Sequence, residues 1–176
     1  MRKRLLIAAA VALPLLAMAG YATAGGGQSA VADVRDVTAA YHSLAAAQQA
    51  GYVLELRTTA GVACIADPSA GGMGVHMVDN RPGGRLDGTI EATEPEALVY
   101  ELRNDGSFKL VAVEYVVDKA TWDASHSSKP VLFGQEFDTV TANPFGLDPF
   151  YALHAWVWKP NPSGILTPWN PRVSCP

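Results

Sequence analysis

Three ionisable side chains lie in segments that are otherwise apolar. His76 is in GVHMV (residues 74–78), Glu114 is in LVAVEYVV (110–117) and His154 is in YALHAWVW (151–158). Apolar runs of this length are typical of buried strands. Because a buried, unpaired carboxylate has a high desolvation cost, Glu114 is expected to be protonated, paired or bound to a metal ion.

Two histidines and one carboxylate form the ligand set of many zinc and non-haem iron sites. The sequence therefore makes His76, Glu114 and His154 candidate ligands for a divalent transition metal, with zinc, iron or copper as the ion. A structural interpretation stays open, because the three residues follow no HxH or HExxH spacing. In that case each histidine donates to a backbone carbonyl and Glu114 pairs with an arginine. The candidate arginines are Arg57, Arg103 and Arg172.

Side-chain alternation along a strand predicts the neighbours of these residues. Glu114 should share a face with Leu110, Ala112 and Val116, which implies little access to water. Four nearby residues could support the three candidates as donors or packing partners: Tyr100, Glu101, Tyr115 and Trp156.

The tryptophans suggest a different kind of site. Trp156 and Trp158 should share the face of His154, and such a pair could form a shelf for a sugar or an apolar ligand. Filling of the core is the ordinary role of such residues. No phosphate-binding loop and no GxSxG nucleophile motif is present in the sequence.

The elements that must position these residues are mostly strands. Residues 33–50 repeat apolar side chains at three- and four-residue steps and end at Gly51, which predicts a helix. Residues 66–74 are rich in glycine and are expected to form a loop, and Asn104-Asp105-Gly106 predicts a hairpin. Strands are expected at 52–58, 74–78, 97–102, 108–117, 131–133 and 151–159.

This order predicts an α+β fold. Helices and strands do not alternate, so a parallel α/β fold is not expected. We expect an antiparallel sheet of about five to six strands, curved or barrel-like, with one N-terminal helix packed on it.

The N-terminus has the features of a secretory signal. Basic residues at positions 2–4 precede an apolar run of 14 residues, and Ala22-Thr23-Ala24 offers a cleavage site. We therefore expect a signal peptide at 1–24, a flexible leader at 25–32 and one globular domain at 33–176. No later apolar run is long enough for a membrane span, so a secreted or periplasmic protein is predicted.

Charge and cysteine content agree with export. The signal segment holds three of the 13 Lys and Arg residues and none of the 17 Asp and Glu residues, which leaves the mature chain at −7. Such a chain is a poor candidate for nucleic-acid binding. Cys64 and Cys175 are the two cysteines, and two thiols in an oxidising compartment are expected to pair.

Several segments together resemble a family of exported bacterial proteins of uncharacterised function. The resemblance runs from the predicted helix to the C-terminus and departs at Met77-Val78-Asp79. It implies no particular activity, but it places His76, Glu114 and His154 in segments that characterise the family. These segments are a Thr38, Tyr41, Ala50, Gly51-Tyr52 pattern, GMGVH (72–76), PEALVYE (95–101), LVAVEYVV (110–117), LFGQ (132–135), HAWVWKPNPSG (154–164) and WNPRVSC (169–175).

The sequence thus favours an exported domain that binds a metal ion through two histidines and one glutamate. The alternative is a non-catalytic module that binds a small ligand or a protein and has a structural polar core. The sequence identifies no reaction and leaves open whether the protein is an enzyme.

Overall fold

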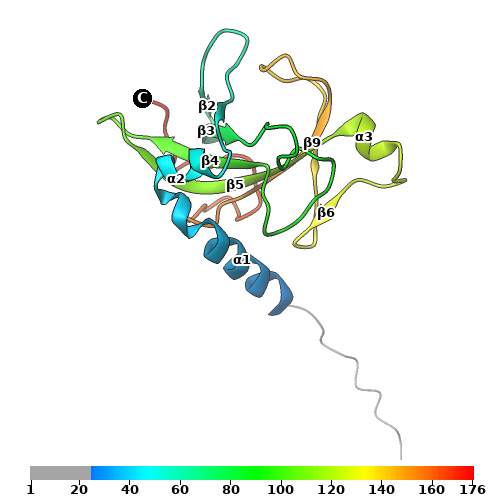
Figure 1. Ribbon diagram of the computed structural model, residues 1–176. Helices are drawn as coiled ribbons and strands as arrows, with labels where there is room; N and C mark the ends of the chain where they lie inside the picture. The colour runs from blue at the N-terminus through cyan, green and yellow to red at the C-terminus, as the bar shows by residue number, and fades with distance from the viewer. Residues whose placement is uncertain (1–24) are drawn as a thin grey trace, which may run out of the picture.

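The computed structural model describes residues 25–176, and most of its ordered elements are strands (Figure 1). The signal peptide predicted at 1–24 lies outside these residues. The strands are β1 Leu54–Glu55, β2 Cys64–Asp67, β3 Gly71–Val78, β4 Ala97–Leu102, β5 Phe108–Asp118, β6 Val131–Leu132, β7 Gln135–Glu136, β8 Asp138–Val140 and β9 Phe150–Ala155.

Seven of the strands form one antiparallel sheet. Its hydrogen-bonded order is β1-β3-β4-β5-β9-β8, and β2 also pairs with β3. The strands β6 and β7 form a separate pair. The prediction of an α+β fold with an antiparallel sheet is confirmed, and the sheet is open rather than closed into a barrel.

The N-terminal helical region differs from the prediction. This region contains α1 Gly25–Thr38, the 3-10 helix η1 Ala39–His42 and α2 Leu44–Gln49. A further helix, α3 Lys119–Asp123, follows β5. The leader predicted as flexible at 25–32 is therefore helical, and the single helix predicted at 33–50 is divided into the end of α1, η1 and α2. The end of α1 is anchored, since Val31 and Val34 are buried in the core and Arg35 Nε donates to Val157 O at 2.6 Å. A new helix can begin at Leu44 because Ser43 Oγ accepts from Ala46 N.

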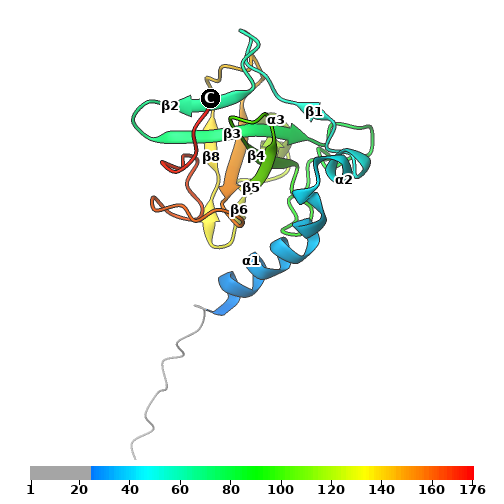
Figure 2. The ribbon, with the colours of Figure 1, turned by 90° about the vertical axis from the view of Figure 1, so that its left-hand side faces the viewer.

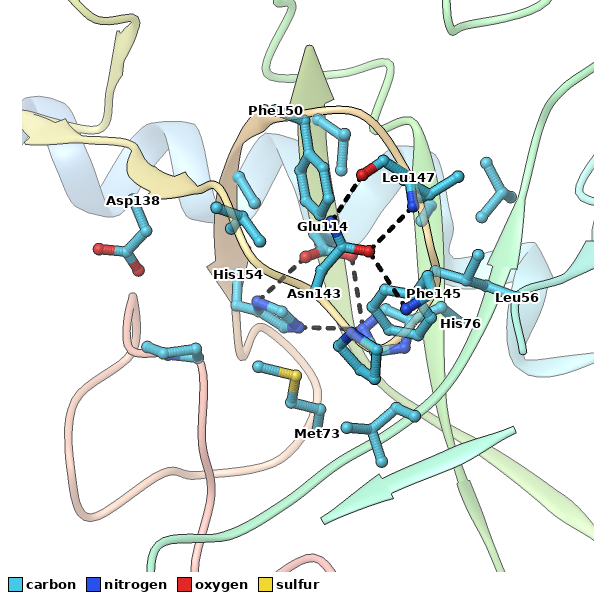
Figure 3. Close-up of a pocket in the computed structure, with 18 of the residues that line it drawn as sticks. Leu56, Met73, His76, Glu114, Asp138, Asn143, Phe145, Leu147, Phe150 and His154 are labelled. Carbon is cyan, nitrogen blue, oxygen red and sulfur yellow. Dashed lines mark hydrogen bonds and ion pairs between the residues drawn. The ribbon is translucent and has the colours of Figure 1, made fainter. Parts of the chain in front are cut away.

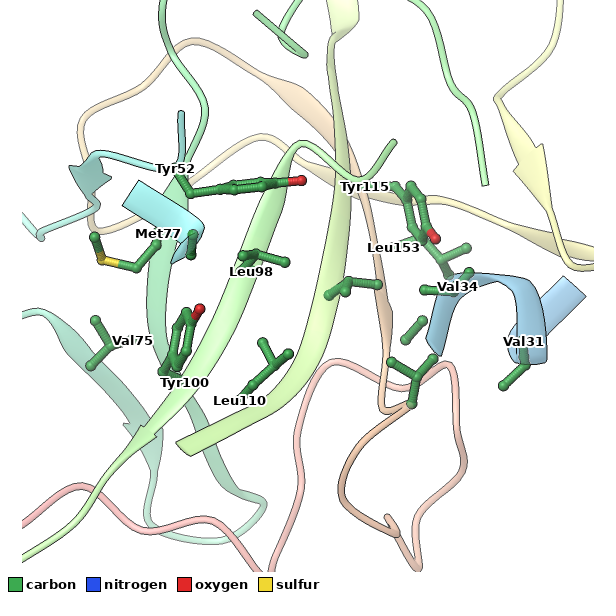
Figure 4. Close-up of a cluster of buried hydrophobic side chains, with 14 of the residues drawn as sticks. Val31, Val34, Tyr52, Val75, Met77, Leu98, Tyr100, Leu110, Tyr115 and Leu153 are labelled. Carbon is green, nitrogen blue, oxygen red and sulfur yellow. The ribbon is translucent and has the colours of Figure 1, made fainter. Parts of the chain in front are cut away.

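The helices pack on one face of the sheet. Figure 4 shows Leu98 and Tyr115 on this face, with Val34 of α1 beside Leu153. The opposite face is covered differently, by the irregular C-terminal tail. There, Val99 and Trp156 form a second buried cluster that includes Val173 of the tail. The sheet thus separates a helix-covered face from a tail-covered face, and Figure 2 shows the red tail on the left and α2 on the right.

The predicted hairpin joins β4 and β5. Arg103 N donates to Ser107 O at 2.9 Å, and Gly106 has the positive φ of 80° that the turn requires. Near its middle the pair contains a bulge, since Val99 pairs with Ala112 but Tyr100 pairs with Leu110. The bulge places Leu110 in the helix-side core, so the prediction that Leu110 shares the face of Glu114 is wrong.

The glycines at 71–74 belong to β3 instead of the predicted loop. The tail runs directly beside them, since Gly72 N donates to Asn170 O and Val173 O. A Cβ at Gly71 would lie 2.3 Å from Asn170 O. These glycines therefore allow the close approach of two backbones.

The predicted disulfide between Cys64 and Cys175 is present, with an S–S distance of 2.05 Å. It links β2 to the tail across a sequence separation of 111 residues. Within residues 25–176, none of the helices combines the length and the apolar character that crossing a membrane needs.

Candidate metal centre

Three strands bring His76, Glu114 and His154 together, as the sequence predicts. Glu114 on β5 is the direct cross-strand partner of His154 on β9, and on its other side it pairs with Ala97 of β4. His76 on β3 pairs with Val99, two residues from Ala97. All three side chains project from the tail-covered face and point toward one another (Figure 3). We refer to these three residues as the trio.

The distances within the trio suit a shared ligand. His76 Nε2 lies 3.1 Å from His154 Nε2 and 3.4 Å from Glu114 Oε2, and Glu114 Oε1 lies 3.4 Å from His154 Nδ1. Bonds of 2.0 to 2.1 Å to a tetrahedral zinc ion imply ligand separations of about 3.3 Å. One ligand atom from each residue lies within 4.8 Å of the others, so the trio could hold a metal ion.

Burial sets the protonation of the trio. All three side chains are buried. Desolvation raises the pKa of Glu114 to about 8 and lowers that of His76 to about 4. Burial lowers the pKa of His154 well below its usual value, and the neighbouring His76 adds to this effect. Without a metal the trio is therefore uncharged at neutral pH, since Glu114 is a neutral acid and both imidazoles are neutral bases.

Among the described residues, no arginine lies within ion-pair distance of Glu114, and the groups at that distance from this carboxyl are the two histidines. Arg57 instead lies beside Glu55, with which it forms an ion pair. The structural interpretation in which Glu114 pairs with an arginine is therefore wrong. His76 Nδ1 is also buried and has no hydrogen-bond partner among residues 25–176. Unsatisfied buried atoms are rare and cost about 1 to 3 kcal/mol each.

A pocket of about 390 Å³ opens from the trio toward solvent. This volume falls in the range of small-molecule sites. Most of its walls are apolar, and Asp138 is the one further ionisable residue that lines it. Asp138 lies to one side, away from the trio (Figure 3). The apolar walls include Leu56, Ile65, Met73, Val140, Phe145 and Phe150.

Of the four predicted supporting residues, only Trp156 lies beside the trio. Its ring is nearly parallel to that of His154, with centroids 6.1 Å apart. Tyr100 and Tyr115 lie in the helix-side core. Glu101 forms an ion pair with Lys159 instead. The bulge and the alternation of β4 and β5 explain why these three residues are directed elsewhere.

The predicted tryptophan shelf is not formed. The strand β9 ends at Ala155, so alternation does not continue to Trp158. Trp156 Nε1 donates to Thr167 O on the tail side, whereas Trp158 Nε1 donates to Thr38 Oγ1 at the end of α1. A different tryptophan, Trp169 of the tail, lines the pocket.

Two features of the site were missed in the sequence. Residues 142–147 form one wall of the pocket, and Asn143 organises this wall by accepting from Phe145 N and Leu147 N. Asparagine before proline is a turn signal, which predicts a loop here but does not predict its place in the pocket wall. Glu96 is a second buried carboxyl, whose pKa burial raises to about 8 and which accepts from Val116 N. No sequence signal marked it, since it precedes β4.

Comparison with known proteins adds no constraint to this geometry, since no family model, curated protein or solved structure matches the chain.

Proposed function

We propose that this protein binds one divalent transition-metal ion (zinc, iron or copper) through His76, Glu114 and His154. The observation that carries the proposal is the convergence of three potential ligand atoms, from three different strands, at the inner end of a pocket. Three protein ligands leave at least one coordination position for a water molecule or another small ligand. The pocket gives such a ligand access to that position.

The partners of Glu114 support a metal over a purely structural network. A structural polar network inside a protein is stable when each member has its partners. Among residues 25–176, the partners of the Glu114 carboxyl at ion-pair distance are the two imidazoles, each at 3.4 Å, which is longer than an ordinary hydrogen bond. A divalent ion would stabilise the charged carboxylate and use both histidines in the neutral form that burial favours.

A second candidate function is binding of an uncharged small molecule without a metal. It is favoured by the apolar walls and by a trio that carries no charge at neutral pH. The two functions differ in a simple test, since binding of an apolar molecule would survive removal of metal by a chelator.

We further propose that the protein is exported after cleavage behind Ala24 and belongs to the family of exported bacterial proteins that it resembles. Support comes from the signal-like N-terminus and from the Cys64–Cys175 disulfide, a bond that persists in oxidising compartments. Mass spectrometry of the mature protein should give a chain that begins at Gly25. A mature chain that still contains Met1 would contradict cleavage.

Isothermal titration of tag-free protein with Zn²⁺ tests the metal proposal. The wild type should bind one ion per chain, and His76→Ala, His154→Ala or Glu114→Gln should weaken binding by more than about 100-fold, since even residues that only support ligands change affinity 10- to 100-fold. His126→Ala is the matched control, because His126 is exposed and stacks on Trp122. Circular dichroism should show that each variant is folded. Absence of binding in the wild type, or equal binding in all variants, would refute the proposal.

A further inference from the structure

The pocket above the trio has an unusual distribution of charge. None of its lining residues is a lysine or an arginine, and Asp138 is the one acidic lining residue apart from Glu114 of the trio. An anion entering the metal-free pocket would therefore find no cationic side chain there. The walls offer an apolar surface to the rest of the ligand.

The mouth of the pocket is also apolar. Leu54, Leu86 and Leu147 line it and remain 39%, 48% and 49% exposed. They come from β1 and from two separate loops, so three distant segments place leucine at the same opening. Exposed apolar side chains that gather at a cavity commonly mark a ligand-binding site.

A bound metal would make the inner end of the pocket positively charged. A divalent ion held by one carboxylate and two neutral imidazoles has a net charge of about +1. A single negative charge on the incoming ligand would neutralise it. The metal thus provides the only positive charge in a pocket whose walls otherwise favour apolar atoms.

We infer that the pocket binds an amphiphilic molecule with a monoanionic head and an aliphatic body, the head bound to the metal and the body running between the apolar walls to the leucines at the mouth. This inference rests on the proposed metal site. A volume of about 390 Å³ has room for roughly a dozen atoms of the size of water. The ligand is therefore a small amphiphile rather than a long-chain lipid.

Three probe molecules distinguish the contribution of the head to affinity from that of the aliphatic body. Zinc-loaded protein is titrated with octanohydroxamic acid, with acetohydroxamic acid, which has the same head and a shorter chain, and with octanamide, which has the chain but a weak metal-binding head. Octanohydroxamate should bind about 50-fold more tightly than acetohydroxamate, which corresponds to burial of three of its six additional methylenes at ~0.8 kcal/mol each. Octanamide should bind more weakly than octanohydroxamate, and chelation of the zinc should abolish hydroxamate binding.

Variants at the mouth test the position of the aliphatic body. Leu54→Ser and Leu86→Ser should each reduce octanohydroxamate affinity several-fold without changing acetohydroxamate or zinc affinity. Val131→Ser is the matched control, since Val131 is 58% exposed and does not line the pocket. Both leucines are on the surface, so these substitutions leave the core intact.

The outcomes distinguish this inference from the metal proposal. Stoichiometric zinc binding with equal affinity for the short and long hydroxamates would overturn the amphiphile and leave the metal site standing. Lack of zinc binding would overturn both. Tight octanamide binding to chelated protein would also overturn the inference and would favour an uncharged ligand instead.

Discussion

Glu114 and His154 are direct partners across β5 and β9, and Glu114 Oε1 lies 3.4 Å from His154 Nδ1. Opposed residues of an antiparallel pair have their Cβ atoms about 4.5 to 5.5 Å apart, so the strand register alone brings these two groups together. His76 comes from β3 and reaches them across β4, where Ala97 pairs with Glu114. The site is therefore a consequence of sheet register and of one small residue on the intervening strand.

Replacing that small residue should disturb the site. Ala97 is buried and lines the pocket between β3 and β5. We expect Ala97→Leu to cost about 1 to 3 kcal/mol of unfolding free energy through overpacking and to weaken zinc binding by separating His76 from Glu114. Urea denaturation and calorimetric zinc titration measure the two effects. Ala120→Leu on the exposed surface of α3 is the control, and unchanged zinc affinity in Ala97→Leu would contradict this account.

Zinc affinity should depend on pH through one proton. At pH 7 Glu114 is protonated because its pKa is about 8, whereas the depressed histidine pKa values leave both imidazoles neutral. Zinc must displace the proton of Glu114, so affinity should rise about tenfold per pH unit between pH 5 and 8 and then level off. Calorimetry in buffers of different ionisation enthalpy counts the released protons. Release of two or more protons per bound zinc ion below pH 6.5 would contradict the lowered pKa values of the histidines.

The metal-free protein should lose stability as pH rises. The folded-state pKa of Glu114, about 8, exceeds its unfolded value of 4.5, so the protonated acid favours the folded state. This contribution is fully present below pH 4.5 and is lost as pH approaches 8. The lowered pKa of His76 acts in the opposite direction below pH 6.5, so the decline should be clearest between pH 6.5 and 8.

Glu114→Gln should remove this pH dependence in part. Above pH 8 the metal-free variant should be more stable than the wild type, by an amount on the order of a few kcal/mol. Glu96→Gln is an informative control, because burial also raises the pKa of Glu96 to about 8 although it is not one of the proposed ligands. Both variants should flatten the stability profile in urea denaturation, but only Glu114→Gln should weaken zinc binding. An equal change in unfolding free energy on Glu114→Gln at pH 6 and at pH 9 would contradict the raised pKa of Glu114.

The disulfide should contribute strongly to stability. Cys64 and Cys175 close a loop with a sequence separation of 111 residues, and the loop-entropy model gives about 4 to 5 kcal/mol for this length. The double variant Cys64→Ser/Cys175→Ser should lose that amount of unfolding free energy in urea denaturation. A loss below about 1 kcal/mol would mean that the tail is held mainly by its contacts with β3.

The sequence predicted the parts of the fold that depend on local patterns. The apolar runs of β4, β5 and β9 and the Asp105-Gly106 turn identified the central strands and the hairpin. The same runs made His76, Glu114 and His154 conspicuous, because charged or polar residues are rare in such segments. Pairing of the two cysteines followed from their number and from the oxidising compartment that the export signal implies.

Other features depend on contacts between distant segments and have no local signal. The glycines at 71–74 form a strand because the tail approaches them, and only the folded chain shows this contact. The short strand β8 is defined by its pairing with β9. The bulge that turns Leu110 away from Glu114 arises from the register between β4 and β5. Tertiary context determined each of these elements.

Anomalous diffraction from crystals of the zinc-loaded protein tests the central claim most directly. We predict one strong anomalous peak at the inner end of the pocket, about 2.0 to 2.2 Å from His76 Nε2, a carboxylate oxygen of Glu114 and a ring nitrogen of His154. A peak found only elsewhere on the protein, or no peak among these three side chains, would contradict the metal centre.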